Sequence, residues 1–386
     1  MKLIITRIIL TLTLSVSMVY SSHAGQGVTE NEIVIGSNQD MSGPFAAFGV
    51  PGVQAAQLYF DKINAAGGVH GRKIRFVVED HGYQMPKAMQ GLNKLVNSDK
   101  IFAMIMQLGT PMNLASFDLM TKKQIANVGP FSSARQMNEP FSDLRYAGLS
   151  HYFDQIRAGI KFINQKSGET KICSMYIPSD FGIEIMEGAK AVAKELNLAY
   201  LAGTTHKPDE EDFVGSLSKL KAEGCEVIAI ALGVRQSITA IATAKKIGWG
   251  EVKFLGSSAS FHTGVAKVPG GLTEGFYCAA GWADLVERLG NPTVAEWVAE
   301  YKGAFGDFPP SGALLGRSTA ETLVRALEAA GKDLNAASFQ RGMESLNYEG
   351  HILGNSVKYG MNDHLGSDDI IISQVVDGNW KELGRQ

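Results

Sequence analysis

The sequence predicts an α/β fold with two open, parallel sheets. Two observations support this prediction. Short apolar runs alternate with stretches of helical periodicity, and the alternation occurs twice, in 32–128 and in 153–255, separated by a loop near 132–146. Strands that alternate with helices pair in parallel, and their helices cover both faces of the sheet. The length of 386 residues also suits two domains.

The first alternation contains four expected strands and three expected helices. An apolar strand at 32–36 is followed by a helix whose apolar residues recur from Val53 to Ile63, and Gly67-Gly68 ends that helix. Pro86 suits the first turn of the next helix. The other expected elements are strands at 74–78, 101–106 and 125–128, and helices at 86–96 and from about 111.

The second alternation is followed by a helix-rich tail that begins near residue 276. One interpretation is that this tail completes both domains, with the chain crossing between them more than once. The tail ends in a hairpin-like stretch at 370–380 around Asp377-Gly378-Asn379. Expected helices lie at 153–163, 181–196, 213–222, 237–247, 294–305, 313–330 and 337–346, and expected strands at 172–177, 199–201, 227–231 and 252–255.

Composition excludes two classes of protein. Hydrophobic residues make up 45% of the chain and charged residues 19%, so a disordered chain is excluded. The formal net charge is -3, so there is no basic excess and we expect no nucleic-acid partner.

The N-terminus has the pattern of a secretory signal peptide at 1–24. Lys2 and Arg7 precede an apolar stretch at 8–20, and Ser22-His23-Ala24 supplies small residues for cleavage. A membrane anchor is the alternative, which these flanks favour less. No cysteine follows the apolar stretch and no later apolar run reaches eighteen residues, so we expect an exported, soluble protein without a lipid anchor.

Three cysteines suit an exported chain with at most one internal disulfide. Cys173 and Cys225 each stand at the head of an apolar run. If these runs are neighbouring parallel strands, both cysteines lie at the same end of the sheet and a disulfide between them is possible. The sequence leaves open whether it forms. Cys278 is expected to be free and buried.

Motifs of catalysis are absent from the sequence. We find no GxSxG, HExxH or GxxxxGK[ST], no metal-ligand spacing of cysteines or histidines, and no GxGxxG after the first strand. We therefore expect no enzyme, no metal and no cofactor. A binding protein is favoured, and ligands of open α/β sheets lie outside the carboxyl ends of the strands.

The loops at those ends carry a family resemblance. Gln39-Asp40-Met41-Ser42-Gly43-Pro44, the stretch 61–71 (DKINAAGGVHG), Asp180-Phe181-Gly182 and the stretch 245–249 (KKIGW) resemble the leucine/isoleucine/valine-binding proteins of ABC importers. These are type I periplasmic solute-binding proteins. The resemblance covers nearly the whole chain after residue 24 and weakens after about Pro309.

The resemblance implies two Rossmann-like lobes that are joined by three crossing segments and that close on a ligand in the cleft between them. The N-terminal lobe would comprise 25–150 plus 279–358, and the C-terminal lobe 151–278 plus 359–386. It also implies a periplasmic location and delivery of the ligand to an ABC permease in the inner membrane. We expect a monomer.

In this family, hydroxyl and backbone N–H groups of the first lobe hold the ligand carboxylate, and the matching positions are Thr110 and Phe131-Ser132-Ser133. The alternative is that these hydroxyls only cap helices starting at Pro111 and Ala134, which is compatible with binding because a helix N-terminus favours an anion. Phe48 matches a first-lobe wall and Phe181 the second-lobe aromatic that closes on the ligand, although either residue can equally belong to the core.

Two departures from the family change the expected ligand. The positions of the acids that neutralise an amino-acid ammonium are occupied by Tyr152 and Ser258, and enclosing an unpaired ammonium is costly. Leucine-like amino acids are then disfavoured, unless an acid reaches the cleft from elsewhere. Arg235, at a strand-to-helix turn, is expected to face the cleft and bind a carboxylate, although a surface salt bridge is its alternative. Arg135 is a weaker second candidate.

Phe48, Phe131, Tyr152 and Phe181 can together enclose a flat ring. The predicted ligand is therefore a small organic acid without an amine, such as a benzoate or a cinnamate-type acid, and the pattern resembles family members that take up aromatic acids. The alternatives are a binding protein for branched-chain or other amino acids, and a periplasmic sensor subunit that presents the same ligand to a receptor.

Overall fold

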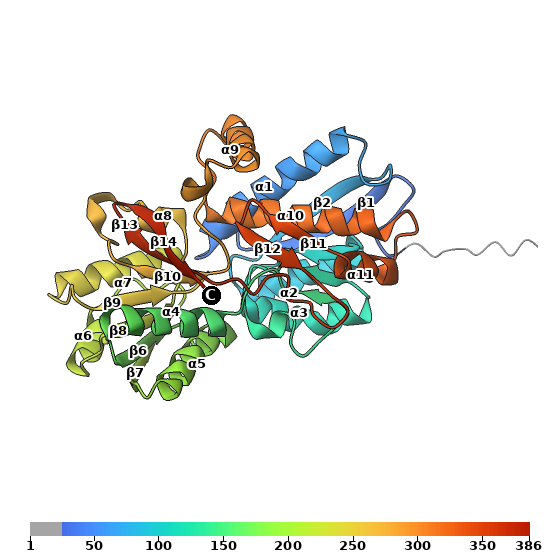
Figure 1. Ribbon diagram of the computed structural model, residues 1–386. Helices are drawn as coiled ribbons and strands as arrows, with labels where there is room; N and C mark the ends of the chain where they lie inside the picture. The colour runs from blue at the N-terminus through green and yellow to red at the C-terminus, as the bar shows by residue number, and fades with distance from the viewer. Residues whose placement is uncertain (1–24) are drawn as a thin grey trace, which may run out of the picture.

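The computed structural model describes residues 25–386, and the predicted signal peptide at 1–24 lies outside the described residues. The chain forms two lobes, each built on its own sheet and each covered by helices (Figure 1). The first lobe contains a five-stranded sheet of order β2-β1-β3-β4-β5, and the second a seven-stranded sheet of order β14-β13-β10-β9-β8-β6-β7.

All neighbouring strands of the five-stranded sheet are parallel, as the alternation of strands and helices predicts. Their carboxyl ends therefore meet at one edge, where the loops to the following helices begin. The strands are β1 (Glu32–Gln39), β2 (Lys73–Asp80), β3 (Ala103–Ile105), β4 (Ala126–Val128) and β5 (Arg145–Tyr146), and the intervening helices are α1 (Ala46–Ala65), α2 (Met85–Asn93) and α3 (Thr110–Lys122).

The tail of the chain returns to this lobe. α10 packs along α1 at close range. The helices are so near each other at Gly316 that a Cβ atom there would lie 2.1 Å from the carbonyl oxygen of Gly52. Only glycine allows two helices to approach this closely. The returning elements are α10 (Ser311–Ala330), α11 (Ala336–Glu344) and the antiparallel pair β11 (Asn347–Gly350) and β12 (Asn355–Lys358).

The seven-stranded sheet has a parallel part and an antiparallel edge. β8 is buried along its full length, which explains its unbroken apolar sequence. The parallel strands are β6 (Lys171–Tyr176), β7 (Ala199–Thr205), β8 (Val227–Ala231), β9 (Lys253–Gly256) and β10 (Tyr277–Ala280). The antiparallel edge consists of β13 (Ile371–Val376) and β14 (Asn379–Arg385). The helices of this lobe are α4 (Tyr152–Ser167), α5 (Asp180–Glu195), α6 (Val214–Ala222), α7 (Val234–Lys246) and α8 (Thr263–Ala266).

The predicted hairpin is confirmed as β13 and β14. Its turn places Asp377 at φ 51° and Gly378 at φ 71°, the pair of positive values that a tight hairpin turn requires. β5, β10, β11 and β12 were not predicted, although β3, β4 and β9, which are comparably short, were predicted. β7 extends four residues beyond the predicted 199–201, since it is an edge strand whose side chains alternate between exposed and half-buried.

The chain crosses between the lobes three times: after β5, after β10 and after β12. The predicted fold class, two open-sheet lobes joined by three crossing segments, is thereby confirmed. The strand β10 belongs to the second sheet as far as Ala280, two residues past the predicted boundary at 278. α9 (Pro292–Phe305) follows the second crossing and pairs with α1 through Lys62 and Glu300, 3.4 Å apart.

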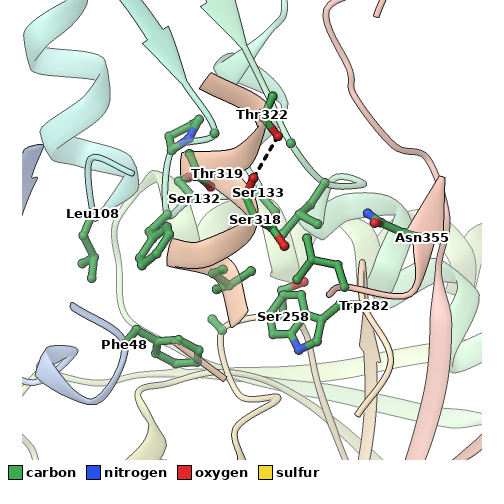
Figure 2. A pocket seen from close by; sticks show the side chains of 18 of the residues that line it. Phe48, Leu108, Ser132, Ser133, Ser258, Trp282, Ser318, Thr319, Thr322 and Asn355 are labelled. Atoms are coloured by element: carbon green, nitrogen blue, oxygen red, sulfur yellow. Dashed lines mark hydrogen bonds between the residues drawn. The ribbon is translucent and has the colours of Figure 1, made fainter. Parts of the chain in front are cut away.

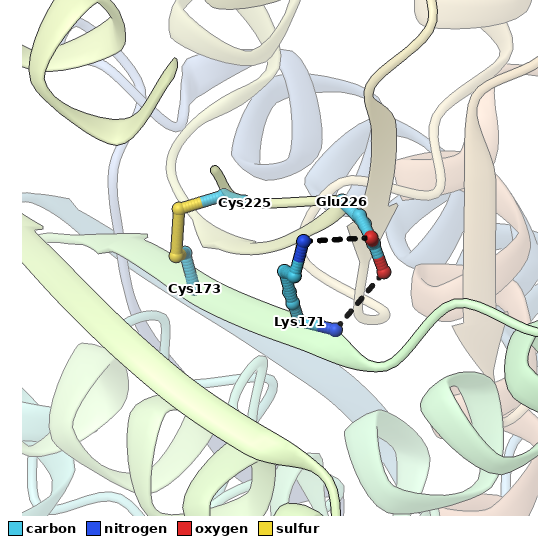
Figure 3. Close-up of a disulfide and its surroundings, with 4 residues drawn as sticks. All are labelled: Lys171, Cys173, Cys225 and Glu226. Atoms are coloured by element: carbon cyan, nitrogen blue, oxygen red, sulfur yellow. Dashed lines mark hydrogen bonds and ion pairs between the residues drawn. A yellow bond between two sulfur atoms is a disulfide. The ribbon is translucent and has the colours of Figure 1, made fainter. Parts of the chain in front are cut away.

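The disulfide that the sequence left open is present. β6 and β8 are parallel neighbours, so Cys173 and Cys225 lie within reach, and their Cα atoms are 5.9 Å apart (Figure 3). Next to the bridge, the Glu226 carboxylate accepts the backbone N–H groups of Thr170 and Lys171. Cys278 is free and buried, as predicted. No helix among residues 25–386 combines the length and hydropathy that crossing a bilayer requires.

Candidate ligand-binding site

A cavity with about 1060 Å³ of empty space, its open mouth included, lies where the two lobes meet. We divide it into two parts. The interlobe part is lined by loops at the carboxyl ends of the strands, namely by Phe45, Phe48, Tyr83, Leu108, Thr110, Phe131, Ser132, Ser133, Tyr152, Phe181 and Ser258. The α10 part extends along that helix to the crossing segments and is lined by Leu149, Trp282, Leu315, Ser318, Thr319, Glu321, Thr322, Tyr348, Gly350, Leu353, Asn355, Val357 and Tyr359 (Figure 2).

Two hydroxyls meet at the N-terminus of α3. Thr110 is the first residue of this helix, and its Oγ1 lies 2.7 Å from Oγ of Ser132. Ser132 Oγ also accepts the backbone N–H of Ala134 at 3.3 Å, so part of the capping alternative holds for Ser132. The Thr110 hydroxyl bonds to Ser132 instead of capping its own helix. Both side chains are buried, and the helix N-terminus beside them favours a negative group.

Four aromatic rings connect the lobes around these hydroxyls. Phe45 and Tyr83 belong to the first lobe, with ring centroids 4.5 Å apart, and Tyr152 and Phe181 belong to the second, with centroids 5.2 Å apart. The two pairs meet where Phe45 faces the edge of Phe181 at 6.3 Å. The rings thus form a continuous series of aromatic contacts from one lobe to the other.

Tyr152 is a neutral group in this site. Its phenol is hydrogen-bonded to the Ser132 side chain and to the Ser133 backbone, and burial raises its pKa above the usual range. The phenol therefore keeps its proton and can donate a hydrogen bond, but it cannot neutralise a cation. Ser258, at the second family acid position, has its Oγ 3.4 Å from the Gly281 N–H and is likewise uncharged.

Glu321 is the one acidic residue among the described residues that line the cavity. Its carboxylate is already paired, with Arg317 at 2.9 Å and with Arg325 at 2.7 Å. Two guanidinium groups thus compensate one carboxylate, so Glu321 offers no free negative charge to a ligand ammonium.

The prediction that Arg235 faces the cleft is wrong. Its side chain is 67% exposed, pairs with Glu211 at 3.1 Å on the surface and does not line the cavity. The reason is helical phase: α7 begins at Val234 and turns about 100° per residue, and Gln236 and Ser237 occupy its buried face. The alternative of a surface salt bridge is the one the structure contains. Arg135 also pairs with acids, Glu184 and Glu187.

The other eight predicted residues all line the one cavity: Phe48, Thr110, Phe131, Ser132, Ser133, Tyr152, Phe181 and Ser258. Their contact with a ligand stays a prediction. The predicted ring sandwich is composed differently, however. Phe48 packs against His262, with centroids 5.1 Å apart, and the Phe131 ring lies against the α1 backbone at Gly52. Phe45 and Tyr83 take their places.

Sequence reasoning missed Phe45 and Tyr83 although a usable signal was present. Phe45 follows the carboxyl end of β1 and Tyr83 that of β2, where ligands of open sheets lie. His81 fixes Tyr83 by accepting its backbone N–H at Nδ1, 2.9 Å away, while Nε2 contacts the Leu108 carbonyl at 3.2 Å. Burial lowers the pKa of His81, which favours the neutral ring that both contacts need.

The α10 part had no signal in the sequence. Ser318, Thr319 and Thr322 recur at helical spacing, which is the pattern of an ordinary polar helix face. Their side chains face a cavity only because β11 and β12 fold over α10 (Figure 2). No group of three or more metal-ligating side chains occurs in residues 25–386.

Comparison with known proteins agrees with this architecture. A sequence model of the periplasmic binding protein family matches residues 32–379. An amino acid binding protein from Pseudomonas aeruginosa is 26% identical over 228 residues, which are 57% of this chain, and the match spans little more than half, 58%, of that relative.

Two solved structures share the fold. The fatty acid ABC transporter substrate-binding protein from Thermomonospora curvata has a TM-score of 0.84 at 24% identity, with 93% of each chain covered. A solute-binding protein of an ABC transporter from Rhodopseudomonas palustris, in complex with 3,4-dihydroxy benzoic acid, has a TM-score of 0.81 at 17% identity, with 92% of this chain and 98% of that chain covered.

Proposed function

Because the chain belongs to the periplasmic binding protein family, we propose that it is the periplasmic ligand-capturing subunit of an ABC importer and that its ligand is an organic acid without an amine. One observation carries the ligand class. The cavity presents buried hydroxyls at the N-terminus of α3, and no unpaired acid is found among its described lining residues.

Thr110 and Ser132 are the groups proposed to hold the carboxylate. A carboxylate accepts hydrogen bonds at both oxygens, and two hydroxyls with the first backbone N–H groups of α3 supply donors of the right kind. The two hydroxyls lie 2.7 Å apart, so both can donate to one bound anion. Because Arg235 does not line the cavity, hydrogen bonds and the helix dipole are the interactions that would stabilise the bound carboxylate.

An amino-acid ligand is disfavoured by the absence of a partner for its ammonium group. Tyr152 and Ser258 are neutral, and Glu321 is neutralised by Arg317 and Arg325. Enclosing the ammonium group would then leave a positive charge without its hydration or a counter-charge, which costs several kcal/mol, of order 3–5, in a buried site.

Within the acids, we favour an aromatic carboxylate. The rings of Phe45, Tyr83, Tyr152 and Phe181 line the same cavity as the hydroxyl pair and can pack against a flat ring by stacking or edge contacts. The fold shared with the Rhodopseudomonas palustris protein that binds 3,4-dihydroxy benzoic acid supports this class.

A fatty acid is the second candidate. The α10 part of the cavity continues the site beyond the aromatic rings, between Leu149, Leu315 and Leu353, and an acyl chain can follow such a channel. The shared fold with the fatty-acid-binding protein of Thermomonospora curvata supports this candidate.

We propose that capture works by a shift between open and closed lobes. Several contacts join the lobes directly: the Glu184 carboxylate accepts the Arg135 backbone N–H at 3.1 Å, and His262 Nε2 lies 3.3 Å from the Ala47 carbonyl. A ligand that touches Thr110 on one lobe and Phe181 on the other adds to these contacts only in the closed state, which is the state we expect a monomeric subunit to present to its permease. A sensor subunit would use the same closure, and uptake of labelled ligand by cells with and without the protein distinguishes the two roles.

A thermal-shift panel on refolded, ligand-stripped protein tests the ligand class. The panel contains leucine, isoleucine, valine, octanoate, benzoate, cinnamate and 4-hydroxycinnamate. A ligand at a hundred times its Kd adds about 2.7 kcal/mol to the free energy of unfolding, which is a readily measured rise in Tm. We expect acids without an amine to raise Tm. A rise with the branched-chain amino acids alone would contradict the proposal.

A further inference from the structure

The far end of the α10 part contains a buried amide without a full set of partners. Asn355 is 3% exposed and lines the cavity. Its Oδ1 has no hydrogen-bond partner, and its Nδ2 reaches the Gly281 carbonyl only at 3.5 Å. Figure 2 shows its side chain projecting from β12 at the end of the cavity opposite to Phe48 and Leu108 in this view. A buried amide oxygen is rarely left unpaired, so this one calls for an explanation.

The backbone around Asn355 leaves room for its amide. A Cβ atom at Gly350, the residue paired with Asn355 across β11 and β12, would lie 2.5 Å from Oδ1. Any other residue at position 350 would therefore displace the amide oxygen. The absence of a side chain at Gly350 keeps the amide in place.

Two hydroxyls of α10 line the same part of the cavity. They belong to Ser318 and Thr319. The Thr322 hydroxyl, one turn after Ser318, is already hydrogen-bonded: its Oγ1 lies 2.7 Å from the Tyr348 hydroxyl and 3.0 Å from the Ser318 carbonyl. Asn355 thus holds a buried oxygen without a partner, and the Ser318 and Thr319 hydroxyls line the same part of the cavity as the apolar walls of Trp282 and Leu353.

The length of the α10 part sets the shape of a ligand that fills the whole cavity. α10 lines the cavity from Leu315 to Thr322, and these two residues are seven steps apart along the helix. At a rise of 1.5 Å per residue, that stretch is about 10 Å long. A molecule that fills it and also reaches Thr110 must be extended.

We propose that Asn355, with Ser318, forms a subsite for a hydroxyl group at the far end of an extended acid. This rests on the proposed function, which places the carboxylate at Thr110 and Ser132. The Asn355 Oδ1 accepts, so the ligand group must be a donor. It must also be neutral, because Glu321 is paired with two arginines and offers nothing to a second cation. A hydroxyl meets both conditions, whether its carbon frame is an aryl-alkene or an aliphatic chain.

Two pairs of acids that differ by one hydroxyl test the subsite: cinnamate with 4-hydroxycinnamate, and octanoate with 8-hydroxyoctanoate. Affinities are measured by isothermal titration calorimetry for the wild-type protein and for Asn355→Leu and Ser318→Ala. Asn347→Leu is the matched control, since Asn347 is exposed on β11 of the same hairpin. Melting of each unliganded variant reports its folding.

We expect the hydroxylated acid of one pair to bind at least about tenfold more tightly than its partner, because a site built for a hydroxyl leaves polar groups unpaired when the hydroxyl is missing. Asn355→Leu should reduce this preference to about twofold or less, chiefly by weakening the hydroxylated acid, and Ser318→Ala should reduce it in part. Asn347→Leu should leave it unchanged.

Three results would overturn the subsite. The first is equal binding of both acids of each bound pair. The second is an Asn355→Leu variant that keeps the preference. The third is a loss of affinity in Asn355→Leu that is the same for both acids. In each of these cases an acid still binds and the proposed function stands. If no acid of either pair binds the wild-type protein, the subsite fails, and the thermal-shift panel shows whether the proposed function fails with it.

Discussion

Thr110→Val is the substitution that most sharply separates ligand binding from folding at the α3 N-terminus. Valine keeps the shape of threonine and replaces its hydroxyl by a methyl group. Thr110 is buried, and its Oγ1 bonds to Ser132 Oγ at 2.7 Å. Ser132 retains the Ala134 N–H at 3.3 Å after the substitution, so its oxygen is not left without a partner.

The two expected costs differ in size. Losing a neutral hydroxyl–hydroxyl bond lowers the free energy of unfolding by about 1 kcal/mol. Losing a hydrogen bond to a bound carboxylate costs about 1.5–3 kcal/mol of binding free energy, because one partner is charged. We therefore expect Kd for the acid to rise about tenfold to a hundredfold, while the unliganded protein melts only slightly earlier.

Calorimetric titration gives Kd, and chemical denaturation without ligand gives the free energy of unfolding. Thr121→Val is the matched control, since it makes the same change on the exposed face in the last turn of α3. If the Kd of Thr110→Val for the acid is within twofold of the wild-type Kd, Thr110 does not hold the carboxylate. The ligand orientation that we propose, with its carboxylate at the α3 N-terminus, is then wrong.

Three further predictions concern other parts of the molecule. Arg235→Ala should change ligand affinity by less than twofold and the free energy of unfolding by less than about 0.5 kcal/mol, because its side chain is 67% exposed; a tenfold loss of affinity in a titration would return Arg235 to the site. Burial lowers the pKa of His262 to about 4, so the folded state favours the neutral ring. The unfolded chain has the ordinary pKa of about 6.5, so the free energy of unfolding should decrease by up to about 3 kcal/mol as the pH falls from 6.5 to 4. Chemical denaturation at several pH values should show this decrease in the wild-type protein and not in His262→Gln. Equal pH dependence of the free energy of unfolding in the two proteins would contradict the prediction. Replacing Cys173 and Cys225 together by alanine should lower the free energy of unfolding by about 4 kcal/mol, since the bridge closes a loop of 52 residues, and an unchanged denaturation midpoint would show that the bridge does not stabilise the protein.

The fold was predictable because its signals are local and repeated. The apolar run of β8 and the periodic stretch of α4 each report their own environment, and their alternation is enough to define the sheet class. The disulfide was predictable as a possibility, since neighbouring parallel strands place Cys173 and Cys225 at one end. Whether it forms depends on the Cα distance, which the sequence does not contain.

The site was predictable where the strand ends define it and not elsewhere. Thr110, Ser132 and Tyr152 lie at or just beyond such ends, and all three line the cavity. Arg235 lies at such an end too, but a single helical step turns its side chain outward, and sequence gives no such precision at the first turn of a helix. Asn355 reaches the cavity because the chain returns to the first lobe after β10, and no local pattern reports such a contact between segments distant in sequence.

A crystal structure of the protein with the acid that gives the largest thermal shift is the most direct test of the ligand orientation. We predict the carboxylate oxygens within about 3 Å of Thr110 Oγ1 and Ser132 Oγ, the ring or chain beside Phe181, and the far end along α10 toward Asn355. A carboxylate at the opposite end of the cavity, beside Asn355, or an amino acid whose ammonium group contacts Glu321, would contradict the assignment.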